Sequence, residues 1–512
     1  MPNTNVGTCS EARGFSKSSC FGPVALLLAA AALCLEFSAS AATALWNWTS
    51  GDRNWSITAN WTGNVPANTN DVIFGMADAQ TAATPVNTVD GSITVKSLAF
   101  TNSAAGAYTS YQNTTVAVGQ ILTITNGLGV GVGNSVGYAA NPFTYANLTG
   151  AGGAVLVTGG NVQVGYQSSS SASTTVSALL DMRGLDGFTY TNLAGTFGVA
   201  ASGQRRSGGE AYLASTNNIT ASAISLGIGV NASGSSAGSL HLGANNSLFA
   251  DTITLAKLVN GGVIDFQTGL NHPVAKIRAK DGVSGVANWY VGWNSTGGTS
   301  STGIGTNDFS GGILDAAVTN LFIGYFNTGG SGTRAAGGSS TIGTNASSSL
   351  VVQNLFVGAM ASSSSLATFS TVGNFNVLGG TVTAGAVTLA QQLGLGVATG
   401  NLRLNDCAMQ VNGDLASGGT STISASNATL NVVGRIGAPA TVIGTMNLIS
   451  ANLGLTLIAP GNYLQAAASV AALNIDGANG STVLKINNVS PAPGQYPLIA
   501  YTSLGGAAGF AG

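Results

Sequence analysis

The segment LLDMRGLDGF, residues 179–188, is the compact charged cluster in which carboxylates of this 512-residue chain could do chemistry together. Asp181 and Asp186 flank Arg183 there, and a glycosidase needs two carboxyl groups about 5 to 10 Å apart across one bond. A local ion pair or an Asp-Gly turn is the favoured interpretation, because both are common uses of such residues. Polysaccharide cleavage by a lyase or glycosidase therefore ranks third among the functions considered.

The two histidines, His241 and His272, do not fall in a spacing that binds zinc. The glycine-rich stretch 128–137 lacks the Lys-Ser or Lys-Thr pair of a phosphate-binding loop, and the tandem repeats of calcium-binding β-rolls are missing. We therefore expect no catalytic residue, no cofactor and no metal site, and predict that the chain is not an enzyme.

Trp289 and Trp293, in NWYVGWN, are the residues most suited to bind a ligand. Their i, i+4 spacing would put both indoles on one face of a strand, and exposed indoles stack on sugar rings. The sequence thus predicts a carbohydrate-binding site at this pair.

Four of the six tryptophans lie between Trp46 and Trp61. They could stack on sugars, but the end of a repetitive β-fold exposes an apolar cross-section that large aromatics can cover. A cap is favoured, because Pro66 and the segment 71–74 have the pattern of the turn and first strand beneath it.

Composition indicates a β-rich fold. Lys, Arg, Asp and Glu make up 6% of the chain, against about 25% in a typical soluble protein, and 74 residues are glycine. The 45% hydrophobic content is enough for a core. The formal net charge is −2 and no basic run extends beyond Arg205-Arg206, so nucleic acid is not expected as a partner.

The middle of the chain repeats itself. Residues 213–227 and 242–256 align without a gap at an offset of 29, and 304–324 and 342–358 share IGTN followed by NLF-[IV]-G. NWYVGWN and NVQVGYQ (161–167) are fainter copies of the closing strand. Alternating apolar residues ending at a glycine predict short strands joined by tight corners.

Stacked strands and corners of this kind predict an all-β, right-handed parallel β-solenoid with an N-terminal Trp-rich cap; a pair of β-sandwiches is the alternative. At roughly 20 to 30 residues per coil, we expect roughly 15 to 23 coils. Asn246, Asn307 and Asn345 occupy similar places in their repeats and are predicted to stack as a ladder.

Residues 1–41 have the pattern of a secretion signal, with an apolar stretch at 24–35 and cleavage expected after Ala41. Only Cys407 would remain, so no intramolecular disulfide is expected, and no later apolar stretch is long enough for a transmembrane helix. The expected regions are the cap and first coils (42–110), the solenoid repeats (111–480) and an end segment (481–512).

A tryptophan-rich motif opens the region after the signal. Its residues are Trp46, Trp48, Gly51, Asn54, Trp55, Asn60, Trp61, Gly63, Pro66, Asp71 and Phe74. The motif resembles the start of bacterial secreted proteins with autotransporter-associated β-strand repeats, and 92–100 and 485–506 are similar to that family's first coil and end region. The resemblance implies export and a passenger-like β-solenoid at the cell surface, and it implies no reaction. A translocator barrel pattern is missing, so the chain is expected to be released or its end segment to be incomplete.

These patterns together predict a secreted or cell-surface scaffold of the adhesin kind. Polysaccharide binding is the alternative, with extracellular polysaccharide or cell-surface components as the expected partners.

Overall fold

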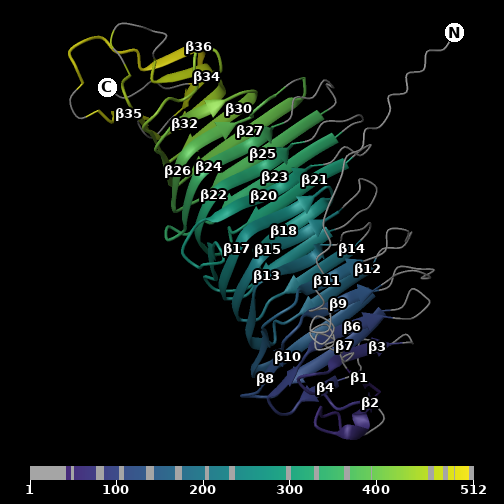
Figure 1. The fold of residues 1–512 in the computed structure, drawn as a ribbon. Coiled ribbons are helices and arrows are strands. Elements are labelled where there is room, and N and C mark those ends of the chain that lie inside the picture. Colours follow the sequence, from purple (N-terminus) through teal and green to yellow (C-terminus); the bar gives the residue numbers. More distant parts are fainter. Residues whose placement is uncertain are drawn as a thin grey trace, which may run out of the picture. The chain divides into compact units, whose positions relative to one another are not determined.

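The computed structural model covers the compact unit that follows the predicted signal (Figure 1). It describes residues 42–47, 51–76, 86–102, 109–133, 143–167, 176–201, 207–229, 237–295, 301–327, 334–361, 369–393, 395–458, 460, 466–476, 482–488 and 491–506. The predicted signal at 1–41 lies outside these residues. Within them, no helix is long and apolar enough to cross a membrane.

The chain folds into a parallel β-solenoid of about 12 turns, which confirms the predicted fold class. Each turn passes through three faces, here called A, B and C, in that order. Every strand pair among the described residues is parallel except β1 with β2 (Trp61–Gly63). The strands stack in chain order from β1 to β36, as Figure 1 shows.

Face A consists of β4 (Val86–Val89), β7 (Thr109–Val116), the first half of β10 (Phe143–Val157), β12 (Val176–Asp181), β14 (Ser207–Tyr212), β16 (Ala237–Leu242), β18 (Asn260–Phe266), β21 (Ser301–Asp308), β23 (Arg334–Ile342), β25 (Phe369–Val377), β27 (Val397–Asn405), β30 (Thr420–Ser426), β32 (Ile443–Ile449), β34 (Ala468–Asp476) and β36 (Ile499–Gly505).

Face B consists of β5 (Ile93–Val95), β8 (Ile121–Ile124), the second half of β10, the first halves of β13 (Leu185–Ala201), β15 (Thr216–Ile228) and β17 (Asn245–Lys257), then β19 (Val274–Arg278), the first halves of β22 (Ile313–Phe326), β24 (Ser349–Met360) and β26 (Thr381–Leu389), and β28 (Ala408–Val411), β31 (Thr429–Val432), β33 (Asn452–Leu455) and β35 (Val483–Ile486).

Face C consists of β1 (Thr43–Trp46), β3 (Asp71–Met76), β6 (Ser97–Asn102), β9 (Leu128–Gly133), β11 (Val162–Gln167), the second halves of β13, β15 and β17, then β20 (Val286–Asn294), the second halves of β22, β24 and β26, and β29 (Leu415–Ser417). One short 3-10 helix, η1 (Thr58–Asn60), precedes β2.

The core runs through the middle of the stack. Side chains alternate inward and outward along each strand, as in Ile224 and Leu226, both fully buried, which stack on Ile253 and Leu255 of the next turn. This pairing confirms the repeat offset of 29 residues predicted there. Cys407, also buried, is a free thiol.

Some turns are longer than the roughly 20 to 30 residues per coil that the sequence predicted. Equivalent positions are 21 residues apart from Arg403 to Ser424 and 43 apart from Asp265 to Asp308. The NLF-[IV]-G copies do stack, with Phe322 opposite Phe356, but IGTN at 304–307 lies opposite residues 337–340 and not opposite the second IGTN. The boundaries at 110 and 480 remain predictions.

A column of residues with left-handed backbone bends face C on nine successive turns. Its members are Gly131, Gly165, Ala200, Gly227, Ala256, Gly292, Gly324, Gly358 and Ala390. Wherever strands from Gly131 to Gly358 pair on both sides of the member, their register is the same before and after it, so neither strand has an extra residue and each member is a left-handed bend that repeats on the next turn. The glycine corners predicted from the repeats are therefore present, although three positions hold alanine.

The predicted asparagine ladder was wrong for the residues chosen. Asn246 accepts a hydrogen bond from the Asn217 amide (2.8 Å), Asn307 donates to the Ser340 hydroxyl (3.3 Å), and Asn345 lies in a turn. None of the three stacks on another, because Asn246 lies on face B, Asn307 lies on face A and Asn345 lies outside the strands. Ladders of asparagine do form elsewhere, on faces A and C.

Candidate functional site

The two tryptophans of β20 point to opposite sides of the sheet, so the expectation of one shared face is wrong. Trp289 is 2% exposed and packs edge-to-face against Phe309, with ring centroids 6.1 Å apart. Trp293 lies half-buried on the outer surface. The reason is Gly292, whose φ of +75° bends the strand and reverses the alternation of inward and outward side chains after Val291.

The outer surface of face C carries a row of stacked rings around Trp293. Tyr290 stacks on Phe322 with centroids 4.9 Å apart and planes 9° apart, and Phe322 stacks on Phe356 at 4.8 Å and 8°. These spacings equal the separation of neighbouring strands, because the three residues are register partners on consecutive turns.

A second row lies beside the first, on the other side of the left-handed bend. Trp293 stacks on Tyr290 at 4.4 Å, and Tyr325 contacts Phe322 at 4.4 Å. We call Tyr290, Trp293, Phe322, Tyr325 and Phe356 the aromatic platform. All five are half-buried, so each ring keeps part of its surface open to solvent.

Polar groups fix the edge of the aromatic platform. The Trp293 Nε1 donates to Asn327 Oδ1 (3.0 Å), and the Lys257 Nζ lies 4.2 Å from the centroid of the Trp293 ring. Burial lowers the pKa of Lys257 and raises the pKa of the Tyr290 and Tyr325 hydroxyls, so both tyrosines stay neutral donors at physiological pH.

An asparagine ladder runs parallel to the aromatic platform, two residues earlier on each strand. The Asn320 amide donates to Asn288 Oδ1 (3.2 Å), and the Asn354 amide donates to Asn320 Oδ1 (2.9 Å). A row of amide edges therefore lies next to a row of rings, which is a suitable combination for binding hydroxyl groups and apolar ring faces together.

Of the platform, the sequence prediction included only Trp293. The signal for the rest was present, because aligning N-W-Y-V-G at 288–292 with the two NLF-[IV]-G segments places Tyr290, Phe322 and Phe356 in one column. Tyr325 could be placed only once the left-handed bend at Gly324 was known.

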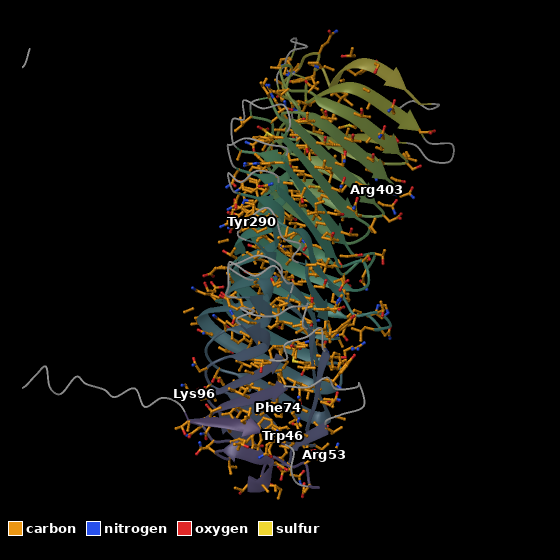
Figure 2. The ribbon with its side chains drawn as sticks, turned by 90° about the vertical axis from the view of Figure 1, so that its right-hand side faces the viewer. Trp46, Arg53, Phe74, Lys96, Tyr290 and Arg403 are labelled. Carbon is orange, nitrogen blue, oxygen red and sulfur yellow. The ribbon has the colours of Figure 1, made fainter. Side chains whose placement is uncertain are left out.

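The opening tryptophans are core residues. Trp46, Trp55 and Trp61 are at most 6% exposed and pack around Phe74, which stacks on Phe100 of the next turn (centroids 5.2 Å apart). Trp46 and Phe74 lie together at the β1 end of the stack (Figure 2). This cluster supports the predicted cap; Trp48 lies outside the described residues.

The predicted carboxylate cluster forms a local ion pair. Arg183 Nη2 lies 2.6 Å from Asp181 Oδ2, and Asp186 is exposed. Burial alone would raise the pKa of Asp181, but the hydrogen bonds and charge of Arg183 outweigh it and lower the pKa. Asp181 therefore stays ionised and paired with Arg183, which is the local ion pair that the sequence analysis favoured over a catalytic role.

His241 lies between two carboxylates from neighbouring strands. Its Nε2 is 3.1 Å from Glu210 Oε1 and its Nδ1 is 2.5 Å from Asp265 Oδ1, while its ring stacks on Tyr212. Sequence spacing could not show this group, because its members come from three turns. His272 is exposed in a turn, and no set of three His, Cys, Asp or Glu side chains that could hold a metal occurs in the described part of the chain.

Comparison with models of known protein families, with curated proteins and with solved structures gave no match to this chain.

Proposed function

We propose that this protein is an exported, non-enzymatic scaffold of the adhesin kind that holds extracellular polysaccharide on its aromatic platform. The observation that carries the proposal is the platform itself: two rows of rings on the outer surface of consecutive turns. Contiguous apolar patches on a protein surface mark interaction sites.

The chemistry of a sugar chain suits this surface. The C–H face of a pyranose is apolar and stacks on an aromatic ring, while its hydroxyl groups need donors and acceptors at the side. Rings repeat here at the strand spacing of about 4.8 Å, which is comparable to the length of one sugar unit. Consecutive sugars along the stack would meet consecutive rings, with the amides of Asn288, Asn320 and Asn354 beside them.

The scaffold part of the proposal is supported by the stack of about 12 turns and by the low charge. Like charges repeated at the same position on every turn would repel one another and destabilise the solenoid. A low charged fraction therefore favours a long stack of turns. Export to the cell surface or medium, with cleavage near Ala41, is supported by the pattern of residues 1–41 and by the resemblance of residues 46–74 to autotransporter-associated repeat proteins. A scaffold without a ligand, in which the rings only stabilise their turns, is the alternative.

The test is depletion of the purified protein from solution by a panel of insoluble cell-wall and algal polysaccharides. We expect selective depletion by at least one of them. The triple variant Tyr290→Ser, Trp293→Ser, Phe322→Ser should lose it, because it removes three of the five rings of the aromatic platform.

Tyr501→Ser is the matched control, since Tyr501 is a tyrosine 50% exposed on β36 and is not part of the platform. It should bind as the unchanged protein does. If no polysaccharide depletes the unchanged protein, or if the triple variant binds equally well, polysaccharide binding by the platform is wrong and the scaffold without a ligand remains.

A further inference from the structure

A second outward surface, on face A, carries a column of polar side chains. The column begins at Asn113 on β7 and ends at Asn474 on β34, with one polar residue at the same register position on every turn between them. The group around His241 belongs to it. In a parallel stack, such a column presents hydrogen-bonding groups at each strand spacing of about 4.8 Å.

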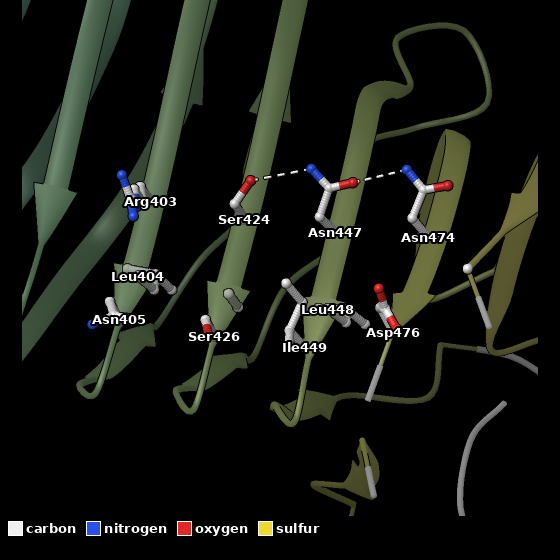
Figure 3. Close-up of a pocket in the computed structure, with 12 residues that line it drawn as sticks. Arg403, Leu404, Asn405, Ser424, Ser426, Asn447, Leu448, Ile449, Asn474 and Asp476 are labelled. Atoms are coloured by element: carbon white, nitrogen blue, oxygen red, sulfur yellow. Dashed lines mark hydrogen bonds between the residues drawn. The ribbon is translucent and has the colours of Figure 1, made fainter. Parts of the chain in front are cut away.

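The column passes through a groove where it crosses β27, β30, β32 and β34 (Figure 3). The groove has a volume of about 670 Å³. Along one side, the Asn447 amide donates to Ser424 Oγ (3.1 Å) and the Asn474 amide donates to Asn447 Oδ1 (2.8 Å). Each asparagine keeps a second N–H and further acceptor capacity for a ligand.

The groove continues past this ladder because the next register partner is Gly505, which has no side chain. Two residues further along the strands lie Asn405, Ser426, Ile449 and Asp476, which also line the groove. Ile449 is 44% exposed and adds apolar surface, and Leu404, Ala425 and Leu448 also line the groove. The lining thus combines hydrogen-bonding groups with apolar surface, which suits a sugar chain with hydroxyl groups and apolar ring faces.

The ends of the groove carry opposite charges. Arg403 and Asp476 are both exposed, and neither makes an ion pair with another described residue. They stand three turns apart, about 14 Å at the usual strand spacing, which is too far for direct contact. In a chain with only 6% charged residues, an unpaired guanidinium in a polar groove points to an anionic ligand.

We propose that this groove binds an extended acidic oligosaccharide that runs along the stack across β27, β30, β32 and β34. Its carboxylate or sulfate group sits on Arg403, its hydroxyl groups bond to the ladder of Ser424, Asn447 and Asn474, and Asp476 accepts hydroxyl groups at the far end. The site is separate from the aromatic platform: Arg403 is on face A and Tyr290 on face C, and Figure 2 shows the two residues on opposite sides of the stack.

The test is titration calorimetry of the whole purified protein with three soluble hexasaccharides: an oligogalacturonate, a sulfated galactan fragment and a neutral cello-oligosaccharide. We expect binding of one or both acidic chains and at least tenfold weaker binding of the neutral one. Tighter binding of the oligogalacturonate identifies a carboxylate as the group on Arg403, and tighter binding of the galactan identifies a sulfate; either result supports the site.

Arg403→Gln should weaken the acidic ligand about tenfold or more, the scale of one charge-assisted contact. Asp476→Asn should strengthen a uniformly acidic chain, because it removes a like charge. Lys276→Gln removes the same unit of charge as Arg403→Gln from an exposed residue on face B, and should leave the affinity unchanged.

Three results would overturn the proposal: no binding of either acidic chain, equal binding of acidic and neutral chains, or equal weakening by Arg403→Gln and Lys276→Gln. The variant Phe322→Ser separates the two sites. If acidic binding depends on Phe322 and not on Arg403, the groove is not the site, whereas the proposed function of the platform still stands.

Discussion

Phe322 stacks on Phe356 of the next turn with ring centroids 4.8 Å apart and planes 8° apart. The two residues are register partners, so the spacing of neighbouring strands sets the distance between their rings. The platform is therefore held in place by the hydrogen-bonded strands beneath it, and little side-chain entropy needs to be lost when a ligand stacks on it.

Phe322 and its neighbour Leu321 should differ sharply when truncated. Leu321 is 2% exposed in the core, so Leu321→Ala should cost about 2 to 5 kcal/mol of local stability. Phe322 faces outward, and Phe322→Ala should cost only about 1 kcal/mol, the scale of one lost ring stack. Hydrogen exchange of the β20, β22 and β24 amides measures both changes. Equal losses would show that the rings serve the core rather than a ligand.

Gly292 should tolerate alanine much less well than another left-handed glycine. Ala200 and Ala256 occupy equivalent positions with a left-handed backbone, so the backbone angle alone does not require glycine. A Cβ at Gly292, however, would overlap the carbonyl oxygen of Gly337, while one at Gly119 (φ +72°) would meet nothing within 4 Å. Gly119→Ala should cost about 1 to 2 kcal/mol and Gly292→Ala more than about 3 kcal/mol, measured as thermal stability.

A similar loss in both variants would show that the left-handed conformation, and not the contact with Gly337, determines the cost at these positions.

The column of left-handed bends also explains which parts of the structure the sequence could predict. Alternation and repeats indicate strands stacked in parallel, and the NLF-[IV]-G copies align as expected. The side of the sheet on which Trp293 lies could not be predicted, because one left-handed residue between it and Trp289 reverses the alternation. The neighbours of His241 and Arg403 on adjacent turns could not be predicted either. The turn length varies between 21 and 43 residues, so the sequence does not show which residues stack.

His241 should make the stability of its turns depend on pH. Burial lowers the pKa of the imidazole, but the hydrogen bonds and charges of Asp265 and Glu210 outweigh it and raise the pKa above its ordinary value of about 6.5. Because the folded state binds this proton more tightly than the unfolded state does, the stabilisation is fully present below about pH 6.5 and is lost as pH rises through the folded pKa.

Thermal unfolding should therefore show a higher midpoint at pH 5.5 than at pH 8.5, and His241→Gln should reduce the difference. His272→Gln is the control, because His272 is exposed and has no ionic partner within the described residues. A pH difference that persists in His241→Gln and vanishes in His272→Gln would contradict the assignment.

The tryptophan cap should protect the backbone amides of the first turns, and of no other turns, from hydrogen exchange. Trp55 is 1% exposed, and its Nε1 donates to the buried Asn87 Oδ1 (2.7 Å). Trp55→Ala should cost about 3 to 5 kcal/mol through the cavity it leaves, and it also removes the donor of a buried acceptor. In a solenoid each turn contacts mainly its neighbours, so the damage should stay local. Amides of β3 and β6 should exchange faster, while those of β30 and β32 should not change.

Trp293→Ala provides the matched comparison, since it removes the same side chain from the outer surface and should leave β3 and β6 protected. Equal exchange of β3 and β6 in the two variants would mean that the opening tryptophans do not close the end of the core.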